Sequence, residues 1–237
     1  MTPVLELSDV SKDYRGLRPL RIARLVVGAA EQVAILGWDG PAAEVFVNLV
    51  TGTTLPDRGD VKVFGRPTAD VGDSADWLAL VDRFGMVSER AVLLDQLSVI
   101  QNLAVPFTLD IEPPPDEVRE RASALASEVR LPDAMWSRPV RDLDQASRVR
   151  VRLGRALALD PAVVLLEHAS VGLTREDRAV LGADVRAIAR GRGAATVTLT
   201  RDEDFAAAVA TRVLTVDPAT GRLTERRSGW FGRRPVP

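Results

Sequence analysis

Short apolar runs alternate with helix-length segments along most of this chain, and that alternation limits the fold more than any other feature. The runs are rich in Val, Ile and Leu, are bounded by Gly, Pro or charged residues, and cover residues 33–36, 163–166, 196–199 and 213–216. Apolar runs of this length indicate strands buried on both faces, as in parallel sheets. The segments between them predict helices at 42–50, 115–129, 144–159, 175–189 and 204–210. Strands that alternate with such helices predict an α/β fold.

The start of the chain and one central segment depart from this alternation. Residues 4–7, 22–27 and 61–64 are strand-like and have turn signals but no helix between them, which predicts an antiparallel β layer. Three consecutive prolines at 113–115 interrupt the chain before a charged helix. With the segment around them, they indicate an inserted group of helices.

Composition excludes several classes of function. The 237 residues are 46% hydrophobic with a formal charge of -2, which is enough apolar sequence for one substantial core. Acidic residues balance the basic ones along the chain, so the sequence has no basic stripe of the kind that binds nucleic acid. The absence of cysteine excludes disulfides, thiolate metal sites and cysteine nucleophiles, and it fits a reducing compartment. We expect no signal peptide and no membrane span, so any membrane contact would pass through a partner.

Residues 33–52 carry the first link to a known family, and they read VAILGWDGPAAEVFVNLVTG. This strand, glycine-containing loop and helix resemble the Walker A region of ABC transporter ATPases, which reads GPNGAGKST, with Gly37, Gly40 and Gly52 fixing the register. The resemblance implies a RecA-like P-loop NTPase core with the antiparallel layer and an inserted helical subdomain at about 88–143. We expect one cassette domain over 1–223, followed by a basic and aromatic tail at 224–237.

Further positions follow in the order of that family. Tyr14 is similar to the aromatic residue that stacks on adenine, and Glu89 stands at the glutamine of the Q-loop. Glu167 and His168 stand at the Walker B aspartate and the catalytic glutamate, and Arg201 stands at the switch histidine. The place of the LSGGQ signature is taken by Leu143, Asp144, Gln145, Ala146 and Ser147.

The substitutions in the loop remove groups that a phosphate site needs. The family's nucleotide-binding stretch is Gly37, Trp38, Asp39, Gly40, Pro41, Ala42, Ala43, Glu44 and Val45. A working P-loop uses backbone N–H groups, a lysine on the phosphates and a hydroxyl on Mg²⁺. Here Ala43 replaces the lysine and Glu44 the hydroxyl, Ala42 fills space that glycine leaves open, and Pro41 lacks a donor. Glu44 is either an ordinary acid at a helix start or a substitute for the phosphate charge.

The later substitutions affect metal, water and partner contacts. Glu167 could still reach a metal, whereas we interpret His168 as structural rather than as a general base. Arg201 could clamp a phosphate, but we expect it to pair with the acids that follow it at 202–204. Asp144 predicts a good helix N-cap, and its charge would face the γ-phosphate held by a partner cassette.

These substitutions predict a degenerate cassette with little or no ATP hydrolysis. ATP and Mg²⁺ are the cofactors that the family implies, and we expect weak or absent binding here. The expected partners are a transmembrane permease and a second cassette, in a homodimer or a heterodimer on the inner face of the cell membrane.

Two alternatives accompany this prediction, and the tail has its own. One is a slow but genuine ATPase, with residues 93–107 similar to cassettes of lipid or lipoprotein transport. Another is a soluble regulator that binds nucleotide or another anion without a permease. For the tail, with Trp230 and Phe231 among four arginines, we favour a solvated chain end over docking on lipid or a partner.

Overall fold

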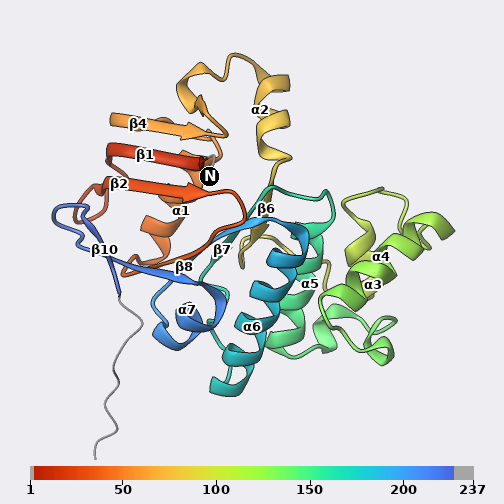
Figure 1. Cartoon of the computed structure of the whole chain (residues 1–237). Coiled ribbons are helices and arrows are strands. Elements are labelled where there is room, and N and C mark those ends of the chain that lie inside the picture. Colours follow the sequence, from red (N-terminus) through yellow and green to blue (C-terminus); the bar gives the residue numbers. More distant parts are fainter. Residues whose placement is uncertain (1–2, 227–237) are drawn as a thin grey trace, which may run out of the picture.

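The computed structural model describes residues 3–226 and contains a six-stranded sheet at its centre (Figure 1). Its strands are β3 (Gln32–Leu36), β6 (Phe84–Val87), β7 (Val163–Glu167), β8 (Ala195–Thr200), β9 (Arg212–Val216) and β10 (Leu223–Glu225). They lie in the order β10-β9-β3-β8-β7-β6, and every pair is parallel except β10 with β9. The predicted α/β fold is therefore confirmed.

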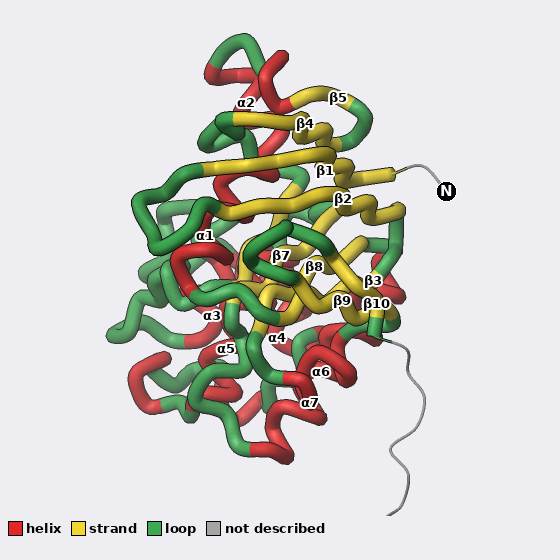
Figure 2. The backbone as a smooth tube through the Cα atoms, turned by 90° about the vertical axis from the view of Figure 1, so that its left-hand side faces the viewer, coloured by secondary structure: helices red, strands yellow, loops and turns green. Residues whose placement is uncertain are grey.

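A second, antiparallel sheet covers one side of the first. It contains β1 (Pro3–Lys12), β2 (Leu20–Gly28), β4 (Arg58–Val63) and β5 (Arg66–Pro67), in the order β2-β1-β4-β5. Figure 2 shows this sheet above the parallel strands and helices α6 and α7 below them. The predicted antiparallel β layer is confirmed.

Seven α-helices surround the sheets in the described part of the chain. They are α1 (Gly40–Val50), α2 (Ser74–Val81), α3 (Val99–Ala104), α4 (Asp116–Glu128), α5 (Gln145–Leu157), α6 (Arg175–Arg192) and α7 (Glu203–Val209). Short 3₁₀ turns occupy Thr68–Asp70, Asp133–Met135 and Val140–Asp142. The five predicted helices are present, whereas α2, α3 and β6 were not predicted. Among residues 3–226, no helix is long and apolar enough to span a bilayer.

Each central strand contributes to two apolar cores, because successive side chains point to opposite faces. In β3, Val33 and Ile35 join the core that holds α1 and the antiparallel sheet. Ala34 and Leu36 join the core beneath α3 to α7. Helix α1 is thus enclosed between the two sheets, and the loop that precedes it is held at both ends by rigid elements.

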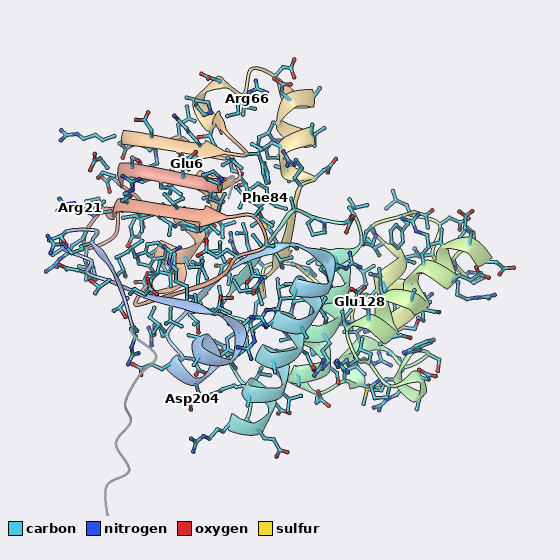
Figure 3. All side chains as sticks on the ribbon, viewed as in Figure 1. Glu6, Arg21, Arg66, Phe84, Glu128 and Asp204 are labelled. Atoms are coloured by element: carbon cyan, nitrogen blue, oxygen red, sulfur yellow. The ribbon has the colours of Figure 1, made fainter. Side chains whose placement is uncertain are left out.

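Helices α3 and α4 lie beside α5, away from the antiparallel sheet (Figure 1). Arg192 of α6 binds both carboxylate oxygens of Glu128 at the end of α4, at 2.7 and 2.6 Å. Glu128 is labelled in Figure 3 on the side of α4 that faces α5 and α6. Residues 88–143 contain α3 and α4, and their treatment as a separate subdomain stays a prediction. The tail at 227–237 lies outside the described residues.

Candidate functional site

The loop from β3 to α1 ends on a carboxylate that caps the helix. Asp39 has φ -81° and ψ 179°, and its side chain accepts a hydrogen bond from the Ala42 amide at 2.9 Å. Pro41 stands in the first turn, where a missing N–H costs little because the first amides of a helix lack intrahelical partners. Gly37 has φ 113°, a conformation that favours glycine. The amide of Ala42, which a phosphate would need, therefore binds the chain's own anion.

The apolar residues of the loop belong to the core. Trp38 is buried and packs against Phe46, with 5.3 Å between their ring centroids. Ala42 and Ala43 are also buried, in the core between the two sheets. The first turn of α1 consequently offers no positively charged side chain to a ligand at the positions that the family uses.

Arg90 forms ion pairs with two carboxylates, those of Glu44 and Glu167. Arg90 Nη1 is 2.9 Å from Glu44 Oε1. Arg90 Nη2 is 2.6 Å from Glu167 Oε2, and Nε is 3.2 Å from the same oxygen. The side chains of Arg90 and Glu44 are about half exposed, at 44% and 47%, whereas that of Glu167 is only 10% exposed. One guanidinium therefore joins α1, the end of β7 and the segment that follows β6.

Arg90 was not predicted as a site residue, whereas its neighbour Glu89 was. Glu89 accepts a hydrogen bond from Gln145 Nε2 at 3.3 Å, and Gln145 also reaches the Val171 carbonyl at 3.5 Å. Glu89 thus contacts the signature loop, while Arg90 contacts α1 and β7. The available signal was a basic side chain directly after the expected Q-loop position, with acids at two other family positions.

His168 follows β7 with φ 48°, in the left-handed region. Its amide donates to the Leu199 carbonyl at 2.8 Å, whereas Nε2 is buried and has no hydrogen-bond partner among the described residues. His168 lines an open cavity of about 750 Å³ together with Gly40, Thr200 and Arg201. The histidine is held by its backbone, and its ring is left without a polar contact in the described structure.

The expectation that Arg201 pairs with the acids after it is wrong. The three acids bind other arginines, in the pairs Asp202–Arg178 at 3.1 Å, Glu203–Arg226 at 2.9 Å and Asp204–Arg175 at 3.7 Å. Within residues 3–226, Arg201 forms no ion pair and is exposed at the cavity. Asp202 also caps α7 by accepting a hydrogen bond from the Phe205 amide, which turns this one side chain toward the helix. Figure 3 labels Asp204 at the start of α7.

Tyr14 lies beside the loop that joins β3 to α1. It lines a smaller cavity, of about 180 Å³, with Trp38, Asp39 and Arg201. Burial, and to a lesser extent the charge of Asp39, raises the pKa of Tyr14 above its ordinary value. The structure thus brings Tyr14 to the loop, and a stacking role for its ring stays a prediction.

The signature segment begins α5 as predicted. Asp144 accepts a hydrogen bond from the Ser147 amide at 2.7 Å, which confirms it as the N-cap. Leu143 and Ser147 are buried, and Gln145 and Ala146 are partly exposed. The exposed carboxylate of Asp144 therefore occupies the helix start.

The two carboxylates at the family's metal positions are paired with an arginine. Glu44 and Glu167, which stand where the family binds Mg²⁺, both contact Arg90. The described structure contains no group of three or more His, Asp or Glu side chains that could hold a metal ion. In this structure the two carboxylates are thus held by a guanidinium rather than free for a cation.

Sequence comparisons place the chain among known proteins. Residues 20–170 match the model of the family described as ABC transporter. A methionine import ATP-binding protein MetN of Brucella abortus is 27% identical over 96% of this chain and 60% of its own length. The MetN of Caulobacter vibrioides is 31% identical over 94% of this chain and 66% of its own length. The chain thus spans about 60–66% of the length of these curated relatives.

Solved structures agree on the fold. CbiO1 from Clostridium perfringens, described as part of the ABC transporter complex CbiONQ, has a TM-score of 0.80 at 19% identity, over 94% of this chain and 88% of its own. The dimeric bacterial ABC transporter cassette MJ0796 has a TM-score of 0.75 at 21% identity, over 95% of this chain and 100% of its own. With the family match, this fold shows that the chain belongs to the ABC transporter family and is one of its ATP-binding cassettes.

Proposed function

We propose that this cassette is a non-catalytic subunit of an ABC transporter. It binds Mg-ATP weakly or not at all, and it acts by docking on a permease and pairing with a second cassette rather than by hydrolysing ATP. The observation that carries the proposal is the set of side chains at and just after the start of α1. Asp39 caps the helix with a carboxylate, and Ala43 is a buried methyl group at the lysine position. The first turn itself holds no acidic residue, and Glu44 adds a second carboxylate directly after it. A nucleotide would have to place its phosphates against these negative charges.

The size of the effect follows from the charged hydrogen bonds that the loop can no longer offer to phosphate. A hydrogen bond to a charged group contributes about 1.5–3 kcal/mol, and each ~1.4 kcal/mol changes an equilibrium constant tenfold. A chain with Ala43 in place of lysine and with the Glu44 carboxylate should therefore bind nucleotide more weakly by two orders of magnitude or more. Arg90 offsets part of the negative charge, but it is already shared between two carboxylates. We expect a dissociation constant for Mg-ATP above about 100 μM.

A groove between β6, α5 and the residues that follow α3 supports docking on a membrane partner. It has a volume of about 330 Å³ and is lined by apolar side chains such as Met86 and Leu159, with Arg152 and Arg155 among them. Arg152 is 8% exposed, and its Nη1 has no hydrogen-bond partner in the described residues. Burial lowers the pKa of both arginines. Such a groove favours an apolar helix of the permease that brings a carboxylate to the two cations.

The relatives suggest the kind of system. MetN is named for methionine import, and a relative from Methylococcus capsulatus is named for sulfate and thiosulfate import. We therefore place this cassette in an import system, at the inner face of the membrane, paired with itself or with a second cassette. These names give no support to a lipid or lipoprotein cargo. The helical part at about 88–143 would receive the permease.

Calorimetric titration with Mg-ATP tests the binding claim directly. The native chain should show a dissociation constant above about 100 μM. The double variant Ala43→Lys with Glu44→Ser should bind at least tenfold more tightly, because it restores a cation and a hydroxyl. Glu44→Gln alone removes only the negative charge and should give a smaller gain. Native binding tighter than 100 μM would contradict the proposal.

A slow ATPase is the second candidate, and one observation favours it. His168 and Arg201 line the same cavity, and neither has an ionic partner in the described structure. ATP hydrolysis by the native chain with its permease, abolished by His168→Ala, would establish this candidate over the first. Failure to purify with any permease would instead favour a soluble regulator.

A further inference from the structure

Three elements that meet at the loop before α1 are joined here by one side chain. Glu44 comes from α1, Glu167 ends β7, and Arg90 follows β6. Arg90 contacts Glu44 at 2.9 Å and Glu167 at 2.6 Å. The guanidinium thus lies between two carboxylates at the positions from which the family would coordinate Mg²⁺.

The chemistry of arginine suits this place. A guanidinium offers five N–H donors in a planar fork and keeps its charge at every physiological pH. Arg90 uses Nη1 toward Glu44, and Nη2 with Nε toward Glu167. Glu167 is only 10% exposed on its side chain, so its charge needs a partner. Arginine supplies that partner without any exchangeable ion.

Arg90 holds a segment that is also bound from the other side. Arg152 Nε donates to the Ala91 carbonyl at 3.3 Å, and Arg155 Nη1 donates to the Val92 carbonyl at 2.7 Å. Both arginines belong to α5. Residues 90–92 are therefore fixed between α1 and β7 on one side and α5 on the other, and Ala91 lines the groove beside α5.

We propose that the Arg90 guanidinium replaces a divalent cation in this cassette and permanently ties the segment after β6 to α1 and β7. The tie needs neither metal nor nucleotide. It keeps Ala91, which lines the groove beside α5, in place without any bound ligand. The inference goes beyond the proposed function, because it concerns the nucleotide-free chain alone.

Manganese binding, measured by electron paramagnetic resonance on the full nucleotide-free chain, tests the replacement. Arg90→Ala frees two carboxylates, so it should bind Mn²⁺ at least tenfold more tightly than the native chain. Adding Glu44→Gln and Glu167→Gln to that variant should abolish the gain. Arg66→Ala is the matched control, because it breaks an Arg–Asp pair of similar exposure that lies far from the site. Equal Mn²⁺ affinity in the native chain and in Arg90→Ala overturns the proposal.

Amide hydrogen exchange measures whether Arg90 holds the segment after β6 in place. Amides of residues 88–92 should exchange at least fivefold faster in Arg90→Ala than in the native chain and in Arg66→Ala. Arg90→Lys keeps one charge but not the fork, so its exchange should be intermediate, and it serves as the second variant if Arg90→Ala does not fold. Unchanged exchange in both Arg90 variants overturns the proposal. Mg-ATP binding tighter than about 100 μM by the native chain would refute the proposed function, whereas these two measurements use no nucleotide and are judged independently.

Discussion

Asp39 shows how one side chain can stabilise a fold and block a ligand at the same time. Its carboxylate accepts a hydrogen bond from the Ala42 amide, which would otherwise lack a partner within the helix. The same carboxylate also complements the positive end of the helix dipole. Because a phosphate would use that amide and that dipole, the stabilising contact opposes nucleotide binding.

Replacing Asp39 separates the cap from the charge. Asp39→Ala should lower the free energy of unfolding by about 1 kcal/mol, since the amide loses its acceptor. For a chain of this size, that corresponds to a melting temperature lower by about 2–4 °C. Asp39→Asn keeps an N-cap side chain and should stay within a few tenths of a kcal/mol of the native value. Thermal unfolding followed by circular dichroism measures both, and an equal loss in the two variants would contradict the capping role.

At the scale of elements, α6 and α7 meet at a glycine. A Cβ at Gly182 in α6 would lie 2.6 Å from the Ala208 Cβ and 3.2 Å from the Val209 amide nitrogen of α7. Gly191 lies in the same helix, and a Cβ there would have no heavy atom within 4 Å. The two glycines therefore have different reasons to be present, although the helix propensity of glycine is equally poor at both.

This difference predicts opposite effects of the same substitution. Gly182→Ala should destabilise the chain by about 1–3 kcal/mol, because overpacking outweighs the gain in helix propensity. Gly191→Ala should stabilise it by up to about 1 kcal/mol, since only the propensity changes. Urea unfolding gives both free energies. If Gly182→Ala were as stabilising as Gly191→Ala, the close approach of α6 and α7 would be wrong.

At the scale of the whole molecule, exposed carboxylates contribute to the loss of folding stability in acid. Hydrogen bonds hold the pKa of three of them below its ordinary value, in the pairs Asp57 with Lys12, Asp76 with Arg66 and Asp217 with Thr220. A group whose pKa is lower in the folded chain stabilises that chain above its unfolded pKa, which is about 3.9 for aspartate. This stability is lost as the pH falls through the folded pKa.

The melting temperature should therefore fall as the pH drops below about 4. Part of that fall should disappear in the triple variant Asp57→Asn, Asp76→Asn, Asp217→Asn, because its side chains take up no proton. Differential scanning calorimetry between pH 7 and pH 3 compares the two profiles. Identical slopes below pH 4 would show that these three groups contribute nothing. Asp9→Asn provides a control, because the Asp9 side chain forms no hydrogen bond or ion pair with another described residue.

The arrangement of the sheets also explains how the site is assembled. In parallel sheets the carboxyl ends of the strands meet at one edge, where ligands bind. Val87 of β6 pairs with Leu166 of β7, so Arg90 and Glu167 leave the sheet close together. Helix α1 starts from the same edge, after β3. Strand order thus brings residues 90 and 167 together, and the helix that follows β3 carries Glu44 to the same edge.

Local patterns in the sequence determined much of this protein. Apolar runs of four residues indicated the buried strands, because a strand covered on both faces needs no polar alternation. Gly37 and the residues after it indicated the loop before α1, and Asp144 was predicted as the N-cap of α5, which the structure confirms. These features depend on neighbours within a few residues, so the sequence alone determined them.

Only the tertiary structure decided the remaining elements and the contacts of the site. Helix α3 has only six residues, which is too short for a readable helical period, and Gly85 interrupts the apolar run of β6. They are stabilised by packing and pairing with distant elements, such as β7 beside β6. The partners of Arg201 and Arg90 likewise depended on where the fold placed acids from other segments. An ion pair between residues far apart in the chain leaves no local pattern, since its formation depends on how the strands and helices are arranged in space.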